Sequence, residues 1–134
     1  YYSANPGGHD FPPAPNTRKI GLARVRQDRF ASIGTDDRGM VEVFHGRRSG
    51  DGLAVNSQCR NGGELRVEVR LPKGKQSEPV AGFEASSCRP VRGDGICQPV
   101  AWKNRTWQDL PADENLLLRF QLVNSDVFAY ELMS

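Results

Sequence analysis

Residue types that perform catalysis are scarce in this sequence and poorly grouped. Of the two histidines, His9 lies in a Gly/Pro-rich stretch and His45 in a loop. A catalytic nucleophile needs a histidine base and a group that orients that base, and no local motif supplies such a set. A glycosidase needs two carboxyl groups about 5–10 Å apart, but the aspartates here fall in turns, where they usually accept hydrogen bonds from the backbone. We therefore predict that this chain is not an enzyme.

The best candidate for ligand binding is an aromatic residue in a polar loop. Trp107 follows Asn104 and Arg105, which begin the N-glycosylation sequon Asn-Arg-Thr. An exposed indole offers a flat apolar face on which a sugar ring can stack. We predict a ligand site formed by Trp107, Arg105, Arg92 and Asp94, and a glycan on Asn104. The alternative is that Trp107 covers one end of the folded domain. The run from Arg92 to Asp94 also spells an integrin-type tripeptide, a short match that arises often by chance.

Three cysteines, Cys59, Cys88 and Cys97, allow one disulfide and leave one thiol over. Cys88 and Cys97 bracket a Gly/Pro-rich loop, and a bridge between them would stabilise it by about 2–3 kcal/mol. Bridges from Cys59 to Cys88 or to Cys97 stay open as alternatives. The spacings of zinc-binding Cys and His residues are missing, so we predict neither a metal nor a cofactor. A disulfide together with a sequon favours an extracellular location.

The charge of the chain is nearly balanced, with 18 basic and 16 acidic residues and a net charge of +2. This balance gives no support for binding to nucleic acid or to a membrane surface. Arginines that alternate with apolar residues are expected on the solvent faces of strands, where they favour solubility. An anionic glycan or an acidic partner is the alternative reason for them. These residues are Arg24, Arg26, Arg29, Arg66 and Arg70.

The elements that would position these residues are short strands joined by tight turns. The chain has 134 residues with 14 Gly and 9 Pro, and no segment shows sustained helical periodicity. Apolar residues alternate with others over residues 64–71 and again over 116–123, so each predicted strand buries one face. Residues 124–126 are predicted to form a tight turn into a hairpin partner at 127–132. Trp102, in another alternating stretch, is expected to face the core.

About nine such strands predict an all-β fold, an antiparallel β-sandwich of the jelly-roll kind. Residues 1–17 contain paired glycines and paired prolines and are predicted to form an extended arm or linker. Residues 18–134 are predicted to form the sandwich domain. Because the chain starts at Tyr1 rather than at Met, we expect a processed chain or a piece of a longer one.

A series of short motifs follows one recognisable order along the chain. The motifs are residues 20–23, 26–33, 82–83, Cys88, 92–94, Trp102 and 118–128. Over about residues 18–132 this order resembles the C-terminal β-sandwich domain appended to secreted glycoside-hydrolase-like proteins of the five-bladed propeller type. The sequence departs from that family at Ser87, where an acidic residue is usual, and at Cys97, where a cysteine is not. The resemblance implies a sandwich fold and an accessory, carbohydrate-associated role without the catalytic propeller.

These observations predict a non-catalytic extracellular module that binds a glycan or supports a partner domain. The alternative is a self-associating structural protein of an extracellular matrix or filament, in which the arm and the odd cysteine join neighbouring copies. The expected partners are a carbohydrate, a partner domain or further copies of the chain, and neither nucleic acid nor a membrane.

Overall fold

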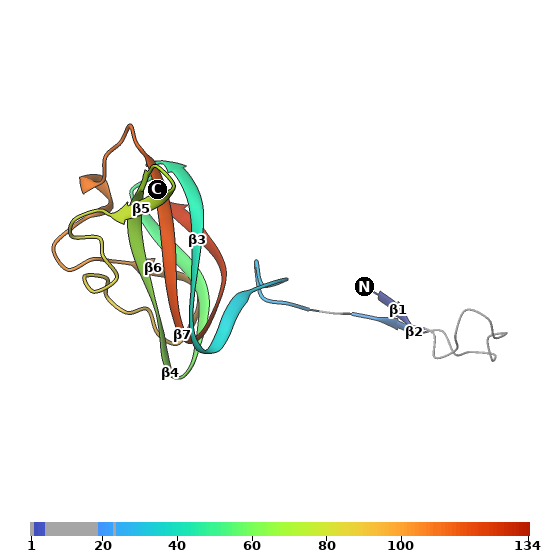
Figure 1. Cartoon of the computed structure of the whole chain (residues 1–134). Coiled ribbons are helices and arrows are strands. Elements are labelled where there is room, and N and C mark those ends of the chain that lie inside the picture. Colours follow the sequence, from blue (N-terminus) through green and yellow to red (C-terminus); the bar gives the residue numbers. More distant parts are fainter. Residues whose placement is uncertain (1, 5–18, 23) are drawn as a thin grey trace.

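The computed structural model describes residues 2–4, 19–22 and 24–134. Within this part of the chain β1 pairs with β2, and five further strands form one antiparallel sheet in the order β3-β7-β4-β5, with β6 also paired to β4 (Figure 1). In chain order the elements are β1 (Tyr2–Ala4), β2 (Lys19–Gly21), β3 (Ile33–Arg47), β4 (Gly52–Lys73), β5 (Gln76–Pro79), β6 (Asp94–Val100), the 3-10 helix η1 (Trp107–Asp109) and β7 (Asn115–Met133).

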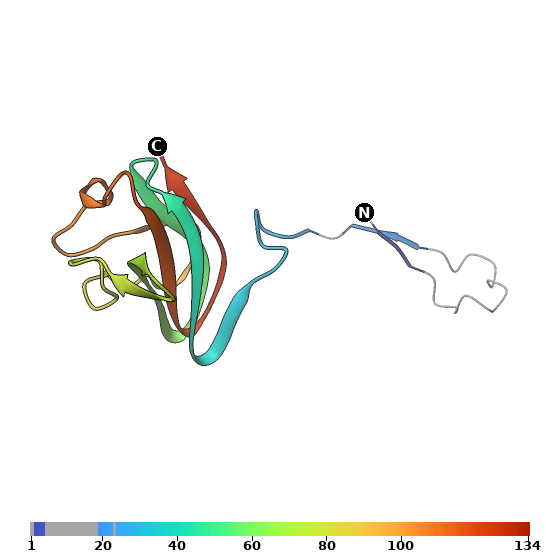
Figure 2. The ribbon, with the colours of Figure 1, turned by 45° about the horizontal axis from the view of Figure 1, so that its top comes forward.

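β4 and β7 are long, curved strands that pair with each other over almost their whole length (Figures 1 and 2). Their ladder runs from Gly52 to Arg70 of β4. On its other edge β4 pairs with β6 through its first half and with β5 through its last residues. β4 has 22 residues, so β6 and β5 pair with different stretches of the same edge.

The bend lies where residues 60–63 of β4 bulge opposite Asn124 of β7. Asn61, Gly62 and Asn124 adopt left-handed backbone conformations, with φ of 48°, 76° and 44°. Bulges of this kind bend a strand and increase its twist without ending it. The turn predicted at 124–126 and the hairpin partner predicted at 127–132 are therefore wrong. Residues 127–132 continue β7 and pair with the first half of β4.

The alternation predicted for residues 64–71 and 116–123 is confirmed. Leu65, Val67 and Val69 of β4 are fully buried, and so are Leu116 and Leu118 of β7. These side chains share one face of the sheet because successive residues of a strand point to opposite faces. The intervening residues form the outer face of the sheet, and most of them are charged or polar.

Loops, rather than a second sheet, cover the core. The connections between β5 and β7 gather on the side of the sheet away from β3 (Figures 1 and 2). Trp102 faces the core as predicted, and its Nε1 donates a hydrogen bond to the carbonyl oxygen of Val67 at 3.1 Å. Val91 and Leu65 exchange backbone hydrogen bonds of 2.9 Å, and Phe83 packs against the Trp102 ring. The loop layer thus completes the hydrophobic core.

The prediction of an all-β antiparallel fold is confirmed. The described residues form five strands in one open sheet, beside the small β1–β2 hairpin, in place of about nine short strands. The sequence predicted too many strands because a bulge within a long strand has residues like those of a turn between two short strands. Residue 1 and residues 5–18, which include His9, lie outside the described part, so the arm stays a prediction. No helix in the described ranges is long and apolar enough to span a bilayer.

The buried face of β7 should carry much of the stability. We expect Leu118→Ala to lower the free energy of unfolding by about 3 kcal/mol, because it removes buried methyl groups and leaves a cavity. Its neighbour Leu117 lies half-buried on the outer face, and Leu117→Ala should cost less than about 1 kcal/mol. Denaturant unfolding of both variants measures the difference, and equal losses would contradict the assignment of the two faces.

Candidate interaction surface

Trp107 does not offer a binding face, and the predicted sugar platform is wrong. Only 3% of Trp107 is exposed. Its ring stacks on that of Trp102 with the ring centres 6.3 Å apart and the planes inclined by 25°, and it lies edge-on to His45 at 5.8 Å. Its Nε1 donates to the carbonyl oxygen of Ser49 at 2.9 Å. The short helix η1 turns the indole inward while the polar residues around it stay exposed. The alternative interpretation, that Trp107 closes one end of the domain, is therefore the correct one.

The sequon residues lie on the surface next to this buried ring. Asn104 and Arg105 are exposed, so Asn104 is accessible and its glycosylation stays a prediction. The Arg105 side chain lies close to Gly82, where an added Cβ would come within 2.7 Å of its Cγ. Gly82 also has a φ of 86°, so this turn needs glycine for its conformation and for its space.

Arg92 and Asp94 are engaged in ion pairs with different partners. Arg92 donates to Glu64 at 2.8 Å, whereas Asp94 accepts from Arg26 at 2.7 Å and lies 2.6 Å from the guanidinium of Arg29. The hydrogen bond from Arg29 is the main reason why the pKa of Asp94 is lowered. The structure therefore does not bring Arg92, Asp94 and Trp107 together as one ligand site.

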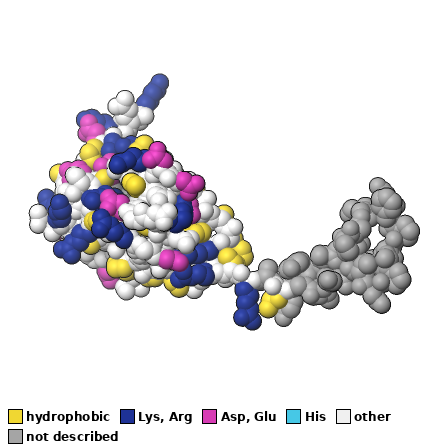
Figure 3. All heavy atoms as spheres, turned by 90° about the horizontal axis from the view of Figure 1, so that it is seen from below, with side chains coloured by type: hydrophobic (Ala, Val, Ile, Leu, Met, Phe, Trp, Pro, Cys, Tyr) yellow, Lys and Arg dark blue, Asp and Glu magenta, His cyan; other side chains and the backbone are white. Residues whose placement is uncertain are grey.

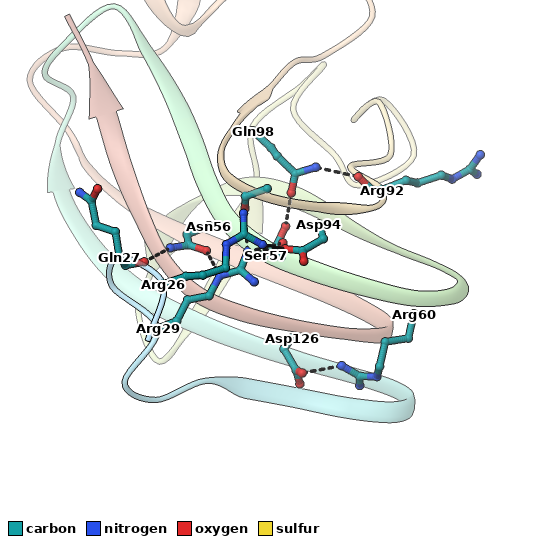
Figure 4. A network of polar contacts seen from close by, with 11 residues as sticks. Arg26, Gln27, Arg29, Asn56, Ser57, Arg60, Arg92, Asp94, Gln98 and Asp126 are labelled. Carbon is teal, nitrogen blue, oxygen red and sulfur yellow. Dashed lines mark hydrogen bonds and ion pairs between the residues drawn. The ribbon is translucent and has the colours of Figure 1, made fainter. Parts of the chain in front are cut away.

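The buried side chain among these partners is Arg29, which we had expected on a solvent face. Its side chain is 7% exposed and bonds to Asn56 Oδ1 at 2.8 Å and to the carbonyl oxygens of Ser57 and Gly95 (Figure 4). Its guanidinium carbon also lies 4.5 Å from the centre of the Phe128 ring. Arg29 thus ties the irregular segment before β3 to β4, β6 and β7. One sequence does not show which of several alternating arginines is buried.

A second arginine holds the sheet together at the bend. Arg60 lies in the bulge of β4, forms an ion pair with Asp126 of β7 and donates to the carbonyl oxygen of Thr35 in β3 at 3.2 Å (Figure 4). Gly34 of β3 has no room for a side chain, because an added Cβ would lie 1.4 Å from Asp126 Oδ1. The bulge, Asp126 and Gly34 therefore form one contact between three strands.

No disulfide forms between Cys88 and Cys97, and all three cysteines are free thiols. Cys88 lies in the core, where the backbone N–H of Val67 donates to its sulfur at 3.3 Å, whereas Cys97 is exposed on β6. Burial raises the pKa of Cys88 and of Cys59, and a hydrogen bond with Glu131 raises that of Cys97. The predicted bridge fails because the two sulfurs point to different surroundings.

The outer face of the sheet carries interlocked charges. Glu42 of β3 accepts hydrogen bonds from Arg119 of β7 at 2.8–2.9 Å, and Arg70 of β4 pairs with Glu68 and lies 3.6 Å from Glu42. Arg119 also lies 3.7 Å from Glu68. The charges of Glu42, Glu68, Arg70 and Arg119 therefore balance one another. On the side of the molecule seen from below, acidic and basic side chains likewise intermix with scattered apolar ones (Figure 3).

The surface with unmet binding capacity is the outer edge of β3. β3 ends the sheet and pairs with β7 alone among the described strands. Met40 and Phe44 are 60% and 65% exposed on its outer face. On the core side a hollow of about 440 Å³ opens beside this edge, lined mainly by apolar side chains that include Val41, Val43 and Phe128. An open strand edge flanked by apolar side chains is suited to binding protein.

The comparisons with known proteins add no assignment. No protein-family model, no curated protein and no solved structure matches this chain. The resemblance to the accessory domains of propeller proteins therefore stays a prediction. Within the described ranges, no three His, Cys, Asp or Glu side chains are grouped so that they could hold a metal ion.

We expect Arg29→Met to lower the free energy of unfolding by about 2–3 kcal/mol, because buried oxygens of Asn56, Ser57 and Gly95 lose their donor. Arg26→Met is the matched control, since Arg26 shares Asp94 but its side chain is 50% exposed, and it should change stability little. Denaturant unfolding tests both. A loss from Arg26→Met as large as that from Arg29→Met would contradict the role of Arg29.

His45 should make the fold sensitive to mild acid. Burial lowers its pKa below the ordinary value of 6.5, and its Nε2 has no hydrogen-bond partner among the described residues. The unfolded chain therefore takes up this proton first as the pH falls below about 6.5, and stability falls with it. Carboxylates with lowered pKa values, such as Glu64 and Asp94, lose their contribution only at lower pH.

The measurement is the free energy of unfolding of wild type and His45→Gln at about pH 7.5 and 5.5, a window set by the ordinary pKa of histidine. Wild type should lose stability between these values and His45→Gln should lose clearly less. Equal losses in both proteins would show that His45 is not the group responsible.

Proposed function

We propose that this chain is a non-catalytic support module of an extracellular, carbohydrate-associated protein, and that it works by protein–protein contact at the outer edge of β3. The open edge of β3, with Met40 and Phe44 exposed beside an apolar hollow, is the observation that carries this proposal. An exposed strand edge can add a strand from a partner, and the main-chain hydrogen bonds then supply affinity.

The distribution of the charged groups supports contact rather than catalysis. The carboxylates that the sheet brings together, Glu42, Glu64 and Glu68, all face arginines at ion-pair distance. The proposal therefore gives these carboxylates a structural role in ion pairs between neighbouring side chains. With Trp107 buried, the carbohydrate association rests on the family resemblance alone, and the extracellular location rests on that resemblance and on the Asn104 sequon.

We further propose that the fold is a two-layer module of the sandwich type, in which the loops between β5 and β7 take the place of a second sheet. This arrangement leaves the part of the sheet near β3 with the thinnest cover. The partners we propose are a neighbouring domain or further copies of the chain, and the latter includes the self-associating structural role.

Hydrogen–deuterium exchange tests the docking role of β3. In the isolated chain, diluted until it is monomeric, the outward-facing amides of residues 38–44 should exchange fast because they lack partners. In the complete product of the gene, isolated in its native assembly, we expect these amides to exchange at least about tenfold slower, since an edge amide that gains a partner needs local opening before it exchanges.

Amides of residues 116–122 serve as the internal control, because β7 lies between β3 and β4 in both states. Their exchange should not change. Equally fast exchange of residues 38–44 in the native assembly and in the diluted chain would contradict the proposal.

A further inference from the structure

We infer that the partner at this edge is a second copy of the chain, whose β3 pairs antiparallel with the first about a twofold axis at Met40. This inference rests on the proposed function in one respect, namely that the β3 edge is a docking surface. It adds the identity of the occupant and the register of the pairing.

The first argument is the form of the edge. Residues 38–44 of β3 pair without interruption with β7, and irregularities occur only between Thr35 and Arg38 and between Phe44 and Gly46. The devices that usually protect an edge strand are Pro, a bulge within it and charged side chains, Lys above all, and the charged side chains of residues 38–44 are Arg38 and Glu42, one of each sign. Residues 38–44 contain no Pro and no Lys, and their backbone is regular, so they offer a short, flat pairing surface.

The second argument is charge complementarity, which selects one register. Residues directly opposite each other in an antiparallel pair lie on the same face and interact. With Met40 opposite Met40, Arg38 of each copy faces Glu42 of the other, so two complementary pairs form. With Glu42 opposite Glu42, two like charges meet, and with Val41 opposite Val41, Glu42 faces Met40. Charge therefore favours the axis at Met40.

The third argument is the unused capacity of these two side chains. Arg38 is exposed and takes part in none of the ion pairs formed by the described residues. The protein contacts of Glu42 from Arg119, Arg70 and Ser77 all reach its Oε2. Its Oε1 therefore remains available for the Arg38 guanidinium of a second copy. The row of alternating charges Glu68, Arg119 and Glu42 would then continue across the axis.

The fourth argument is packing on the core side. In this register Val41 of one copy lies opposite Gly39 of the other, on the face that carries the apolar hollow. Because Gly39 has no side chain, the Val41 residues of the two copies can meet this face without a clash. Met40 meets its own symmetry mate on the outer face, so an exposed apolar residue becomes covered.

Sedimentation velocity over about 1–300 μM protein, a range that brackets weak specific association, is the experiment. We expect a concentration-dependent dimer of wild type. Arg38→Glu should weaken it at least about tenfold, because glutamates then face each other twice. Arg89→Glu is the matched control, since Arg89 is exposed in the loop before β6 and gives the same change of charge.

A cysteine cross-link reports the register without disturbing Glu42. In a Cys97→Ser background, which removes the exposed thiol, Met40→Cys should form an intermolecular disulfide. Two thiols lose two electrons and two protons to an added diamide oxidant. Phe44→Cys is equally exposed but should not cross-link, because the two copies of residue 44 would be separated by eight residues of strand, about 26 Å.

Wild type that stays monomeric at the highest concentration would overturn this inference and leave the proposed function to a different partner domain. A dimer that Arg38→Glu does not weaken, or in which Phe44→Cys cross-links and Met40→Cys does not, would place self-association elsewhere and also overturn it. Circular dichroism and thermal unfolding of each variant show whether it is folded.

Discussion

The bend shared by β4 and β7 is the constraint on which the rest of this structure depends. Four residues of β4 bulge opposite Asn124, and the ladder continues on both sides of them. Arg60 within the bulge forms an ion pair with Asp126 and reaches the backbone of β3, so the bend is fixed from three strands. On one edge, β4 pairs with β6 before the bulge and with β5 after it, so the bulge lies between two neighbours of the same strand.

The two edges of the sheet differ in what covers them. On the side of β4, the short strands β5 and β6 and the loops between β5 and β7 occupy the edge and bring Phe83, Trp102 and Trp107 over the core. On the other side, β3 pairs with β7 along its inner edge, and none of the described strands pairs with its outer edge. The segment that precedes β3 is irregular and is held through Arg29, a buried ionic anchor rather than a further strand. The open edge of β3, which is the candidate interaction surface, is therefore a consequence of the strand order.

The sequence predicted the parts of this fold that depend on local alternation. Residues 64–71 and 116–123 show their buried faces directly, because a strand with one wet face must alternate. The prediction of a turn at Asn124 was wrong, because the same residue types, Asn above all, adopt the left-handed conformation in bulges and in hairpin turns. The errors in the predicted number of strands and in the predicted pairing of residues 127–132 followed from that ambiguity. Only contacts between residues distant in sequence resolve it.

The prediction of the ligand site from the sequence was wrong for a related reason. Trp107 lies among polar residues, which favoured exposure, but the direction of a single side chain in a loop depends on the cavity that it fills. Arg29 was expected in water because a charged residue is rarely buried without partners, and its partners Asn56, Ser57 and Gly95 are distant in sequence. The cysteines show the same limit, since spacing along the chain does not reveal that Cys88 belongs to the core.

The balance of charges on the outer face decides what kind of function this sheet can have. The carboxylates and guanidinium groups in this row pair with one another across three strands, so the row as a whole is nearly neutral. The main-chain groups on the outer edge of β3 differ from these side chains, because their hydrogen-bond partner is water. A second strand can replace this water at a small cost in conformational entropy, since β3 is already ordered. The main-chain groups on the outer edge of β3 have no partner strand in the described part of the chain, whereas the charged groups of the outer face already have partners. The proposed function therefore places binding at the edge of β3 and not on the outer face of the sheet.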